Sequence, residues 1–378
     1  MQVIRNRKHV VIVQRRLTSY RIRLFELMRE KLAADGIELS LIVGSGTAAE
    51  EMKQDGGNLD WAIKVPTKYF LGGKLCWQPF ARHAKDADLV VVTQENKLLS
   101  NFLAMTIQRP KRLAFWGHGA NLQSDNPDGW RERFKRWTSC RVDWWFAYTG
   151  MSVELVKRCG FPGERITNLE NAVDTTELLQ LKSGITAADT AALRQQHGLT
   201  GAKVGVFVGS LYDDKRLDFL FACAQLIRQQ CPTFQLLLIG NGPQRALVED
   251  FCASHATWCH YLGVQKGRDK MRYLSLADVM LNPGLVGLGI LDSFVAGVPM
   301  MTTDCGLHSP EVDYLQNGVN GVMTANTEAA YVEAVLRVLQ DDVLCGRLRQ
   351  GALASAAHYT IENMADNFCH GIKQALLK

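Results

Sequence analysis

The residues from Asn282 to Thr303 combine a glycine-rich loop with an acidic side chain, and that combination suits the binding of phosphate. A mostly apolar run, Ala277–Leu281, ends at Asn282-Pro283. Three glycines follow it: Gly284, Gly287 and Gly289. A short apolar helix is expected next, so loop N–H groups and a helix N-terminus converge on one spot, which is a known way to bind phosphate. Asp292 falls in the first turns of that helix.

The same half of the chain has three earlier glycine turns that also follow apolar runs. These are Val208-Gly209-Ser210, Ile239-Gly240-Asn241-Gly242-Pro243 and Tyr261-Leu262-Gly263. Lys215 and Arg216 follow the first turn and bring positive charge to it. Taken singly, a G-N-G-P sequence is more often a tight turn, and a Lys-Arg pair is usually a solvated helix start. The ordered set is more specific, because open α/β sheets bind ligands at the carboxyl ends of their strands.

Apolar strands and helices alternate along the whole chain, which predicts parallel sheets buried on both faces. The strands expected in the first half are His9–Gln14, Glu38–Gly44, Asp88–Thr93, Arg112–Gly117 and Trp144–Thr149. Those expected in the second half are Lys203–Val208, Phe234–Gly240, Cys259–Leu262, Asp278–Leu281, Val298–Thr303 and Gly321–Thr324. The spacing of apolar residues predicts helices between them, among them Tyr20–Ala34, Leu217–Gln230 and Glu328–Gln340.

Length and composition predict a globular protein of two domains. The chain has 378 residues, of which 47% are hydrophobic and 21% charged. No stretch has the apolar length of a membrane span. The ten cysteines form no C-x-x-C pair, so reduced thiols in the core of a cytosolic protein are expected.

The second half of the chain resembles family 4 of the GT-B glycosyltransferases. The residues that match its donor-binding motifs are Gly209, Lys215, Gly240-Asn241-Gly242-Pro243, Gly287 and Gly297-Val298-Pro299. In the first half, Asn171-Ala172-Val173-Asp174 is similar to the family's sequence at the domain junction. The resemblance implies a GT-B fold, in which two Rossmann-like domains have parallel sheets that face a central cleft.

Two departures from the family's pattern stand out. The family has two glutamates eight positions apart, and alignment on Gly297 puts Gly284 and Asp292 at those positions. The family often has arginine after the strand-end glycine, where this chain has Ser210. Arg216 could replace that charge.

The family's domain roles imply how this chain divides. Residues 1–175 would bind the acceptor, residues 176–360 would bind the sugar nucleotide, and a terminal helix in residues 361–378 would cross back to the first domain. The residues expected to bind the donor are Gly209, Ser210, Lys215, Arg216, Gly240, Asn241, Gly242, Leu262, Gly284, Leu285, Val286, Gly287, Leu288 and Asp292.

Transfer from a sugar nucleotide builds negative charge on a diphosphate leaving group, and the enzyme has to stabilise that charge. No acidic metal-binding pair stands at a strand end, so we expect no metal and no cofactor beside the nucleotide-sugar substrate. The amides of Val286 to Gly289, the helix dipole and Lys215 or Arg216 could stabilise the charge instead. The resemblance gives Asp292 the role of binding the ribose, although an acid in the first turn also stabilises its own helix.

His118, between Gly117 and Gly119 after an apolar strand, is the candidate catalytic residue. The resemblance puts it near the transferred sugar, where it could bind a hydroxyl or carry charge in the transition state. The alternative is a packed or solvent-facing histidine in a turn. The resemblance implies no particular protein nucleophile.

The loop that follows the first strand is basic and replaces the family's glycine-rich loop, so the resemblance implies that it faces the acceptor. Its candidate acceptor-binding residues are Arg15, Arg16, Arg21 and Arg23. They could hold an anionic acceptor such as a lipid-linked saccharide, or they could form an ordinary basic helix face.

Positive charge is concentrated in the first half, which has 27 Lys and Arg against 19 Asp and Glu through Asp174. An anionic membrane surface could explain this, and so could a phosphorylated acceptor or a generically basic surface. Nucleic acid is not an expected partner, because no nucleic-acid module is present. The basic and aromatic segment 130–137 could rest on a membrane or form an ordinary amphipathic helix.

Together with the resemblance, the sequence predicts a metal-independent glycosyltransferase of the cytoplasm, either free or peripheral at the inner face of the membrane. Retention of anomeric configuration and a role in surface glycan biosynthesis are what the resemblance implies. Its partners would be a nucleotide sugar and a saccharide or lipid-linked acceptor. A sugar-nucleotide epimerase of the same fold and a non-catalytic nucleotide-sugar-binding partner remain as alternatives. The sugar, base, acceptor and linkage are not given by the sequence.

Overall fold

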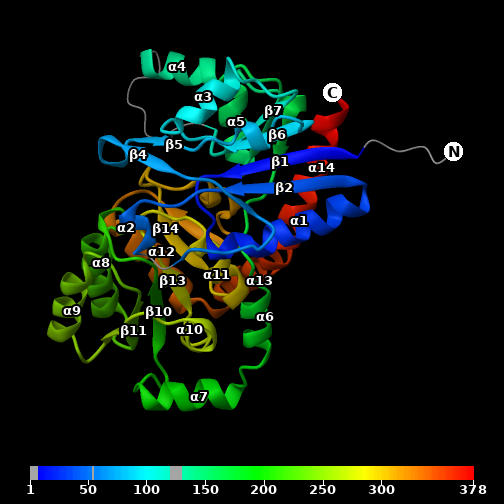
Figure 1. Cartoon of the computed structure of the whole chain (residues 1–378). Helices are drawn as coiled ribbons and strands as arrows, with labels where there is room; N and C mark the ends of the chain where they lie inside the picture. Colours follow the sequence, from blue (N-terminus) through cyan, green and yellow to red (C-terminus); the bar gives the residue numbers. More distant parts are fainter. Residues whose placement is uncertain (1–6, 53–54, 120–129) are drawn as a thin grey trace. The chain divides into compact units, whose positions relative to one another are not determined.

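The computed structural model describes residues 7–52, 55–119 and 130–378, and the chain forms two compact units (Figure 1). Unit 1 consists of Met1–Asp174 together with Thr360–Lys378. Unit 2 consists of Thr175–Tyr359. The end of the chain thus belongs to the same unit as its beginning.

Unit 1 is built on a seven-stranded sheet with the order β3-β2-β1-β6-β7-β8-β9, in which every neighbouring pair is parallel. Its strands are β1 Lys8–Gln14, β2 Ile37–Val43, β3 Ile63–Lys64, β6 Leu89–Thr93, β7 Leu113–Gly117, β8 Trp144–Ala147 and β9 Ile166–Asn168. Its helices are α1 Ile22–Ala34, α2 Ala48–Glu51, α3 Leu99–Met105, α4 Trp130–Ser139, α5 Gly150–Arg158 and α14 Ile361–Leu377. An antiparallel hairpin, β4 Lys68–Phe70 and β5 Leu75–Trp77, lies outside this sheet.

The central strands of unit 1 are buried because helices cover both faces of the sheet. Val10, Val11 and Ile12 of β1 are fully buried, as their apolar side chains on both faces of the strand predict. On one face α14 packs beside α1 (Figure 1). Phe368 of α14 stacks on Phe146 of β8 with ring centroids 4.4 Å apart. The last helix is therefore part of the core of unit 1.

Unit 2 also has a parallel sheet with helices, and its six strands have the order β12-β11-β10-β13-β14-β15. Its strands are β10 Lys203–Val208, β11 Phe234–Ile239, β12 Cys259–Tyr261, β13 Val279–Leu281, β14 Met300–Thr303 and β15 Gly321–Thr324. Its helices are α6 Thr176–Ser183, α7 Ala187–Gln196, α8 Leu217–Gln230, α9 Arg245–Ser254, α10 Gly267–Leu274, α11 Gly289–Ala296, α12 Glu328–Gln340 and α13 Asp342–His358.

The strand order of unit 2 reverses between β10 and β13. From β10 the chain continues outward to β11 and β12, and from β13 it continues the other way to β14 and β15. At such a switch point the loops after the two central strands diverge and leave room for a ligand. The turn after β10 and the glycine-rich loop after β13 both leave the sheet at this point.

The longer predicted elements agree with the structure to within a few residues, and α8 and α12 have the predicted bounds. Helix α1 begins at Ile22 instead of Tyr20, because residues Ser19–Arg21 form a separate 3-10 turn. The edge strands β3 and β9 and the hairpin β4–β5 were not predicted. They are two or three residues long, and so short a run shows no alternation of apolar residues.

Gly371 allows α14 to lie close against the sheet, and we expect Gly371→Ala to destabilise unit 1. A Cβ there would overlap the hydroxyl of Thr167 and would lie 2.7 Å from the Phe146 ring. Overpacking of this kind costs about 1–3 kcal/mol, and the change should lower the free energy of unfolding measured by urea denaturation.

The matched control is Gly346→Ala in α13, where a Cβ would meet no atom within 4 Å. Alanine is the better helix former, so this variant should gain about 0.5–1 kcal/mol. A stabilising effect of Gly371→Ala would contradict the close packing of α14.

Candidate functional site

The candidate site of unit 2 lies where β10 and β13 end, at the reversal of strand order. We call residues Asn282–Leu288 the glycine loop; it joins β13 to α11. The turn η5, Asp213–Lys215, follows β10 and precedes α8. Because both segments leave neighbouring strands at the same edge of the sheet, they meet in space.

Main-chain and side-chain hydrogen bonds fix the first half of the glycine loop. The N–H of Leu285 donates to the Asp214 carbonyl oxygen at 2.7 Å, and the Pro283 carbonyl oxygen accepts from Thr303 Oγ1 at 2.7 Å. Asn282 Nδ2 donates to the Leu285 carbonyl oxygen at 3.2 Å. These groups of the first half of the loop therefore bind the protein itself, whereas Oδ1 of Asn282 is buried with no recorded partner among the described residues.

Gly284 is required by the close approach of the loop to η5. A Cβ at this position would overlap the carbonyl oxygen of Asp214 and would lie 2.6 Å from the carbonyl carbon of Lys215. This is the position at which the family resemblance predicts a glutamate. The packing of two main-chain segments leaves no space for that side chain, which accounts for the glycine.

The second half of the loop presents N–H groups that the protein does not use. Among the described residues, no hydrogen-bond acceptor is recorded for the N–H of Gly287, Leu288 or Gly289. Val286 differs from the expectation, because its N–H already donates to Nδ1 of His308 at 3.1 Å. Three amides at the N-terminus of α11, and not four, are thus available to an anion.

Lys215, the last residue of η5, is buried against the glycine loop, with 9% of the residue exposed. Its Nζ donates to the carbonyl oxygen of Leu285 in the glycine loop. Burial lowers the pKa of the Lys215 ammonium to about 8, while the charge of Asp214 acts in the opposite direction. An anion bound here would restore the stability of the charged form.

Arg216 supports the loop from the protein side. Its Nη1 donates to the Pro283 carbonyl oxygen, to Thr303 Oγ1 and to Asn326 Oδ1, at 3.3, 3.1 and 2.6 Å. Its guanidinium also lies over the Phe219 ring. Of the two predicted cations, Lys215 contacts the loop at the Leu285 carbonyl, two residues before the first free amide, whereas these contacts commit Arg216 to holding the loop in place.

Asp292 lies in the first turn of α11 and is paired with a residue that sequence reasoning missed. Its Oδ1 is 2.9 Å from Nζ of Lys270 on α10. Leu291 and Ser293 on either side are buried, whereas Asp292 is partly exposed. The two residues are 22 positions apart on different helices, so no spacing rule in the sequence predicts the pair.

The remaining predicted donor residues form the turns after β10, β11 and β12. The N–H of Leu211 donates to the Asn241 carbonyl oxygen, and the N–H of Gly240 donates to the Gly263 carbonyl oxygen. Leu262 donates its N–H to Leu238, and its carbonyl oxygen accepts from Gln265 Nε2 at 2.6 Å. These bonds join the three turns to one another, and Ser210 and Asn241 remain exposed.

Cys305 and His308 form a second missed feature beside the glycine loop. The Cys305 sulfur lies 3.6 Å from Nε2 of His308, whose Nδ1 accepts the N–H of Val286. Burial raises the pKa of Cys305, but hydrogen bonds from His308 and from the Leu307 backbone bring it down to about 7. The expectation of core thiols is wrong for Cys305 and Cys159, which are partly exposed, and for Cys140, which is exposed.

In unit 1, His118 follows β7 and is exposed. Its ring meets the Tyr148 ring edge to face, with centroids 4.5 Å apart. His118 stays a candidate catalytic residue because it is an exposed imidazole at the end of a strand.

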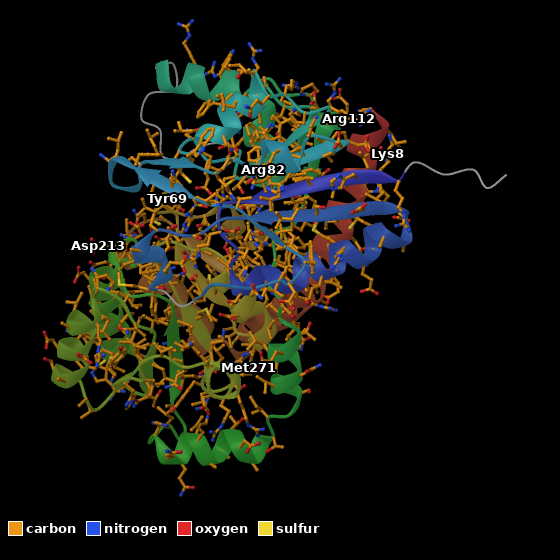
Figure 2. The ribbon with its side chains drawn as sticks, viewed as in Figure 1. Lys8, Tyr69, Arg82, Arg112, Asp213 and Met271 are labelled. Carbon is orange, nitrogen blue, oxygen red and sulfur yellow. The ribbon has the colours of Figure 1, made fainter. Side chains whose placement is uncertain are left out.

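Arg15 and Arg16 are paired with acids of unit 1. Arg15 binds both oxygens of Glu50 at 2.7 Å and donates to Oη of Tyr69 on β4, which is labelled in Figure 2. The Arg15 guanidinium lowers the pKa of Glu50 to about 2. Arg16 pairs with Asp55. Any anionic ligand would compete with these carboxylates.

Arg21 and Arg23 are only two residues apart but differ in environment. Arg21 is buried, donates to Asn171 Oδ1 at 2.6 Å, and lies over the Trp116 ring. Arg21 therefore connects the start of α1 to Asn171 through a buried hydrogen bond inside unit 1. Arg23 is exposed, so of these two arginines it is the one that a ligand can reach.

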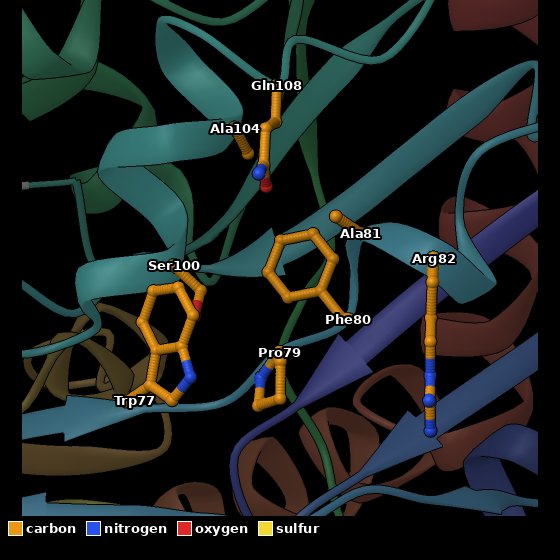
Figure 3. Close-up of a pocket in the computed structure, with 8 residues that line it drawn as sticks. All are labelled: Trp77, Pro79, Phe80, Ala81, Arg82, Ser100, Ala104 and Gln108. Atoms are coloured by element: carbon orange, nitrogen blue, oxygen red, sulfur yellow. The ribbon is translucent and has the colours of Figure 1, made fainter.

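The structure also contains two pockets in unit 1 that the sequence did not predict. One of about 230 Å³ lies at the end of β2 and is lined in part by Arg16, Gly44 and Lys64. The other, of about 270 Å³, lies between the hairpin strand β5 and α3 (Figure 3). Its walls are formed by Trp77, Pro79, Phe80 and Ala104, with Ser100, Gln108 and Arg82 as polar members.

The described residues, 7–52, 55–119 and 130–378, contain neither a candidate metal site nor a membrane-spanning helix. Within them, no group of three His, Cys, Asp or Glu side chains could hold a metal ion. No helix in the same ranges is both long enough and apolar enough to cross a bilayer. The segment 130–137 falls in α4, but the side chains of residues 130–132, 134 and 135 lie outside those described.

Comparison with solved structures identifies the fold. Anabaena Alr3699/HepE, solved in complex with UDP, superposes with a TM-score of 0.70 over 97% of this chain and 99% of that chain, at 16% identity. A glycosyltransferase from Rickettsia africae ESF-5 gives 0.71 over 99% of each chain, at 13% identity. The chain has the GT-B fold.

Sequence comparison relates the chain to glycosyltransferases, with a family match that lies within unit 2. Residues 202–341 match the family described as Glycosyl transferases group 1. The alpha-D-kanosaminyltransferase of Streptomyces kanamyceticus is 23% identical over 227 residues, which are 56% of this chain and 55% of that protein. The chain thus matches about half the length of this curated relative.

The packing at Gly284 predicts that restoring the expected glutamate harms the protein. Gly284→Glu should lower the thermal unfolding temperature, because its Cβ displaces the backbone of η5; the overpacking costs about 1–3 kcal/mol. Gly289→Ala is the control, since a Cβ there meets no atom within 4 Å. A Gly284→Glu variant as stable as the wild type would show that the loop has room for the side chain.

Proposed function

We propose that the protein is a glycosyltransferase that takes a sugar from a nucleotide-diphosphate donor held by unit 2. The observation that carries this proposal is the cluster of three unused amides and the buried Lys215 at the switch point. Amides, a helix N-terminus and an ammonium together recognise a diphosphate, and they stabilise the charge that grows on it as the glycosidic bond breaks.

The comparisons support a nucleotide sugar as the donor. The family match covers this part of unit 2, and Anabaena Alr3699/HepE has been solved with UDP and with UDP-glucose. Asp292 is proposed to bind the ribose. Neither the amides nor Lys215 requires a metal ion to bind the diphosphate, so the proposed transfer is metal-independent and uses no cofactor.

In the proposed reaction, the bond from the sugar C1 to the diphosphate oxygen breaks and a bond from C1 to an acceptor hydroxyl oxygen forms. The proton of that hydroxyl passes to the departing diphosphate. Retention of the anomeric configuration follows from the family resemblance. His118 is proposed to bind the sugar or stabilise its charge.

Unit 1 is proposed to hold a saccharide or lipid-linked acceptor of surface glycan biosynthesis, at the cytoplasmic face of the inner membrane. Arg23 and the pocket beside Arg16 are the candidate contacts. Arg15 would join them if an anionic acceptor displaced Glu50.

The direct test is incubation with a panel of UDP-, GDP- and dTDP-sugars, with and without acceptor lipids. Acceptor-dependent release of the nucleotide is the expected result. A converted sugar nucleotide without acceptor would show an epimerase, and binding without turnover across the panel would show a non-catalytic binder. Asp292→Ala should weaken donor binding, and an unchanged affinity would remove this residue from the site.

The pKa of Lys215 predicts how diphosphate affinity depends on pH. The anion binds the protonated lysine, so affinity should be constant below about pH 8 and should fall by up to tenfold per unit above it. Isothermal titration between about pH 7 and 10, with the nucleoside diphosphate that binds most tightly, measures how the affinity depends on pH.

Lys215→Arg is the matched control, because its guanidinium stays charged across this range. Its affinity should show little dependence on pH, whatever its absolute value. A wild-type affinity that stays constant to pH 10 would exclude contact between Lys215 and the diphosphate.

A further inference from the structure

Lys270 and Asp292 form a partly buried ion pair at the N-terminus of α11. The distance from Nζ to Oδ1 is 2.9 Å, and the two side chains are 19% and 22% exposed. Within the described part of the chain, no partner is recorded for Oδ2 of Asp292. One carboxylate oxygen is therefore held by the protein while the other is available.

The rest of α10 holds Lys270 in this position. The next residue, Met271, is fully buried, and Figure 2 labels it on this helix. The neighbouring pair Arg272–Asp269 on the same helix is longer, at 3.4 Å, and more exposed, at 33% and 62%. Exposed pairs of that kind contribute little, whereas a shielded pair with a short distance fixes both side chains.

The pair joins the two segments between which the proposed nucleoside would lie. Lys270 follows the turn at Leu262-Gly263, and Asp292 follows the free amides of Gly287 to Gly289. A carboxylate this close to the amides would by itself repel a diphosphate. The ammonium of Lys270 cancels that charge, so the acid can remain beside an anion site.

We propose that Lys270 is a positioning and specificity-determining residue for the ribose of the donor. It holds Oδ1 of Asp292 so that Oδ2 accepts a hydrogen bond from one ribose hydroxyl. The remaining protons of Nζ donate to the oxygen of the neighbouring hydroxyl. The pair thus reads the 2′,3′-diol and selects ribonucleotides over deoxyribonucleotides. This inference rests on the proposed donor site of unit 2.

The experiment compares ribonucleoside diphosphates with their 2′-deoxy and 3′-deoxy analogues by isothermal titration. UDP, GDP, ADP and CDP are measured first, and the base that binds best is carried forward. The wild type should prefer the ribonucleotide by about tenfold or more, because a deoxy analogue leaves a polar group of the site unpaired. Lys270→Met and Asp292→Asn should each reduce that preference to about twofold or less.

The double variant should lose little beyond either single change, since the two residues act as one unit. Arg272→Met is the matched control on the same helix and should keep both the affinity and the preference. Thermal unfolding of each variant checks its folding. If Lys270→Met does not fold, Lys270→Gln is used, and the same loss of preference is expected.

The outcomes separate this inference from the proposed function. A wild type that binds none of the four diphosphates overturns the donor site and the inference with it. A wild type that binds without preferring ribose overturns the inference alone. Equal weakening of the ribonucleotide and its deoxy analogues in Lys270→Met would mean that the lysine acts on the phosphates only, which also overturns it.

Discussion

The proposed donor site depends on one main-chain contact, between the glycine loop and the turn η5. The N–H of Leu285 binds the carbonyl oxygen of Asp214, and Gly284 permits the approach because it has no side chain. Lys215, the last residue of the same turn, thereby reaches the Leu285 carbonyl. This contact thus fixes the first half of the glycine loop and brings a buried cation to it.

The same contact explains how the site can lack an acid that related proteins are expected to carry. A second carboxylate at position 284 would have to displace backbone, and its charge would oppose a diphosphate in surroundings where charges interact strongly. The acid that remains, Asp292, is neutralised by Lys270. Lys215 and Arg216 both contact the glycine loop, and their positive charge favours the binding of an anion.

The sequence predicts the parts of this site that depend on order along the chain, and it cannot predict those that depend on packing. Glycines after apolar runs identify the turns after β10, β11, β12 and β13, because strand ends of a parallel sheet share one edge. The pairs Lys270–Asp292 and His308–Val286 depend on how separate segments meet. The need for Gly284 arises from a turn about seventy residues earlier.

Unit 1 shows why charge composition is a weak guide to a binding surface. Its excess of basic residues suggested an anionic acceptor or a membrane, yet Arg15, Arg16 and Arg21 are used within the unit. Among the described residues of this unit, Arg23, Lys68 and Lys74 are exposed and have no recorded ion pair. An anionic acceptor would therefore meet two kinds of cation. Those already paired with Glu50 or Asp55 are costly to recruit, because a carboxylate must first be released, whereas the unpaired surface residues are free to bind.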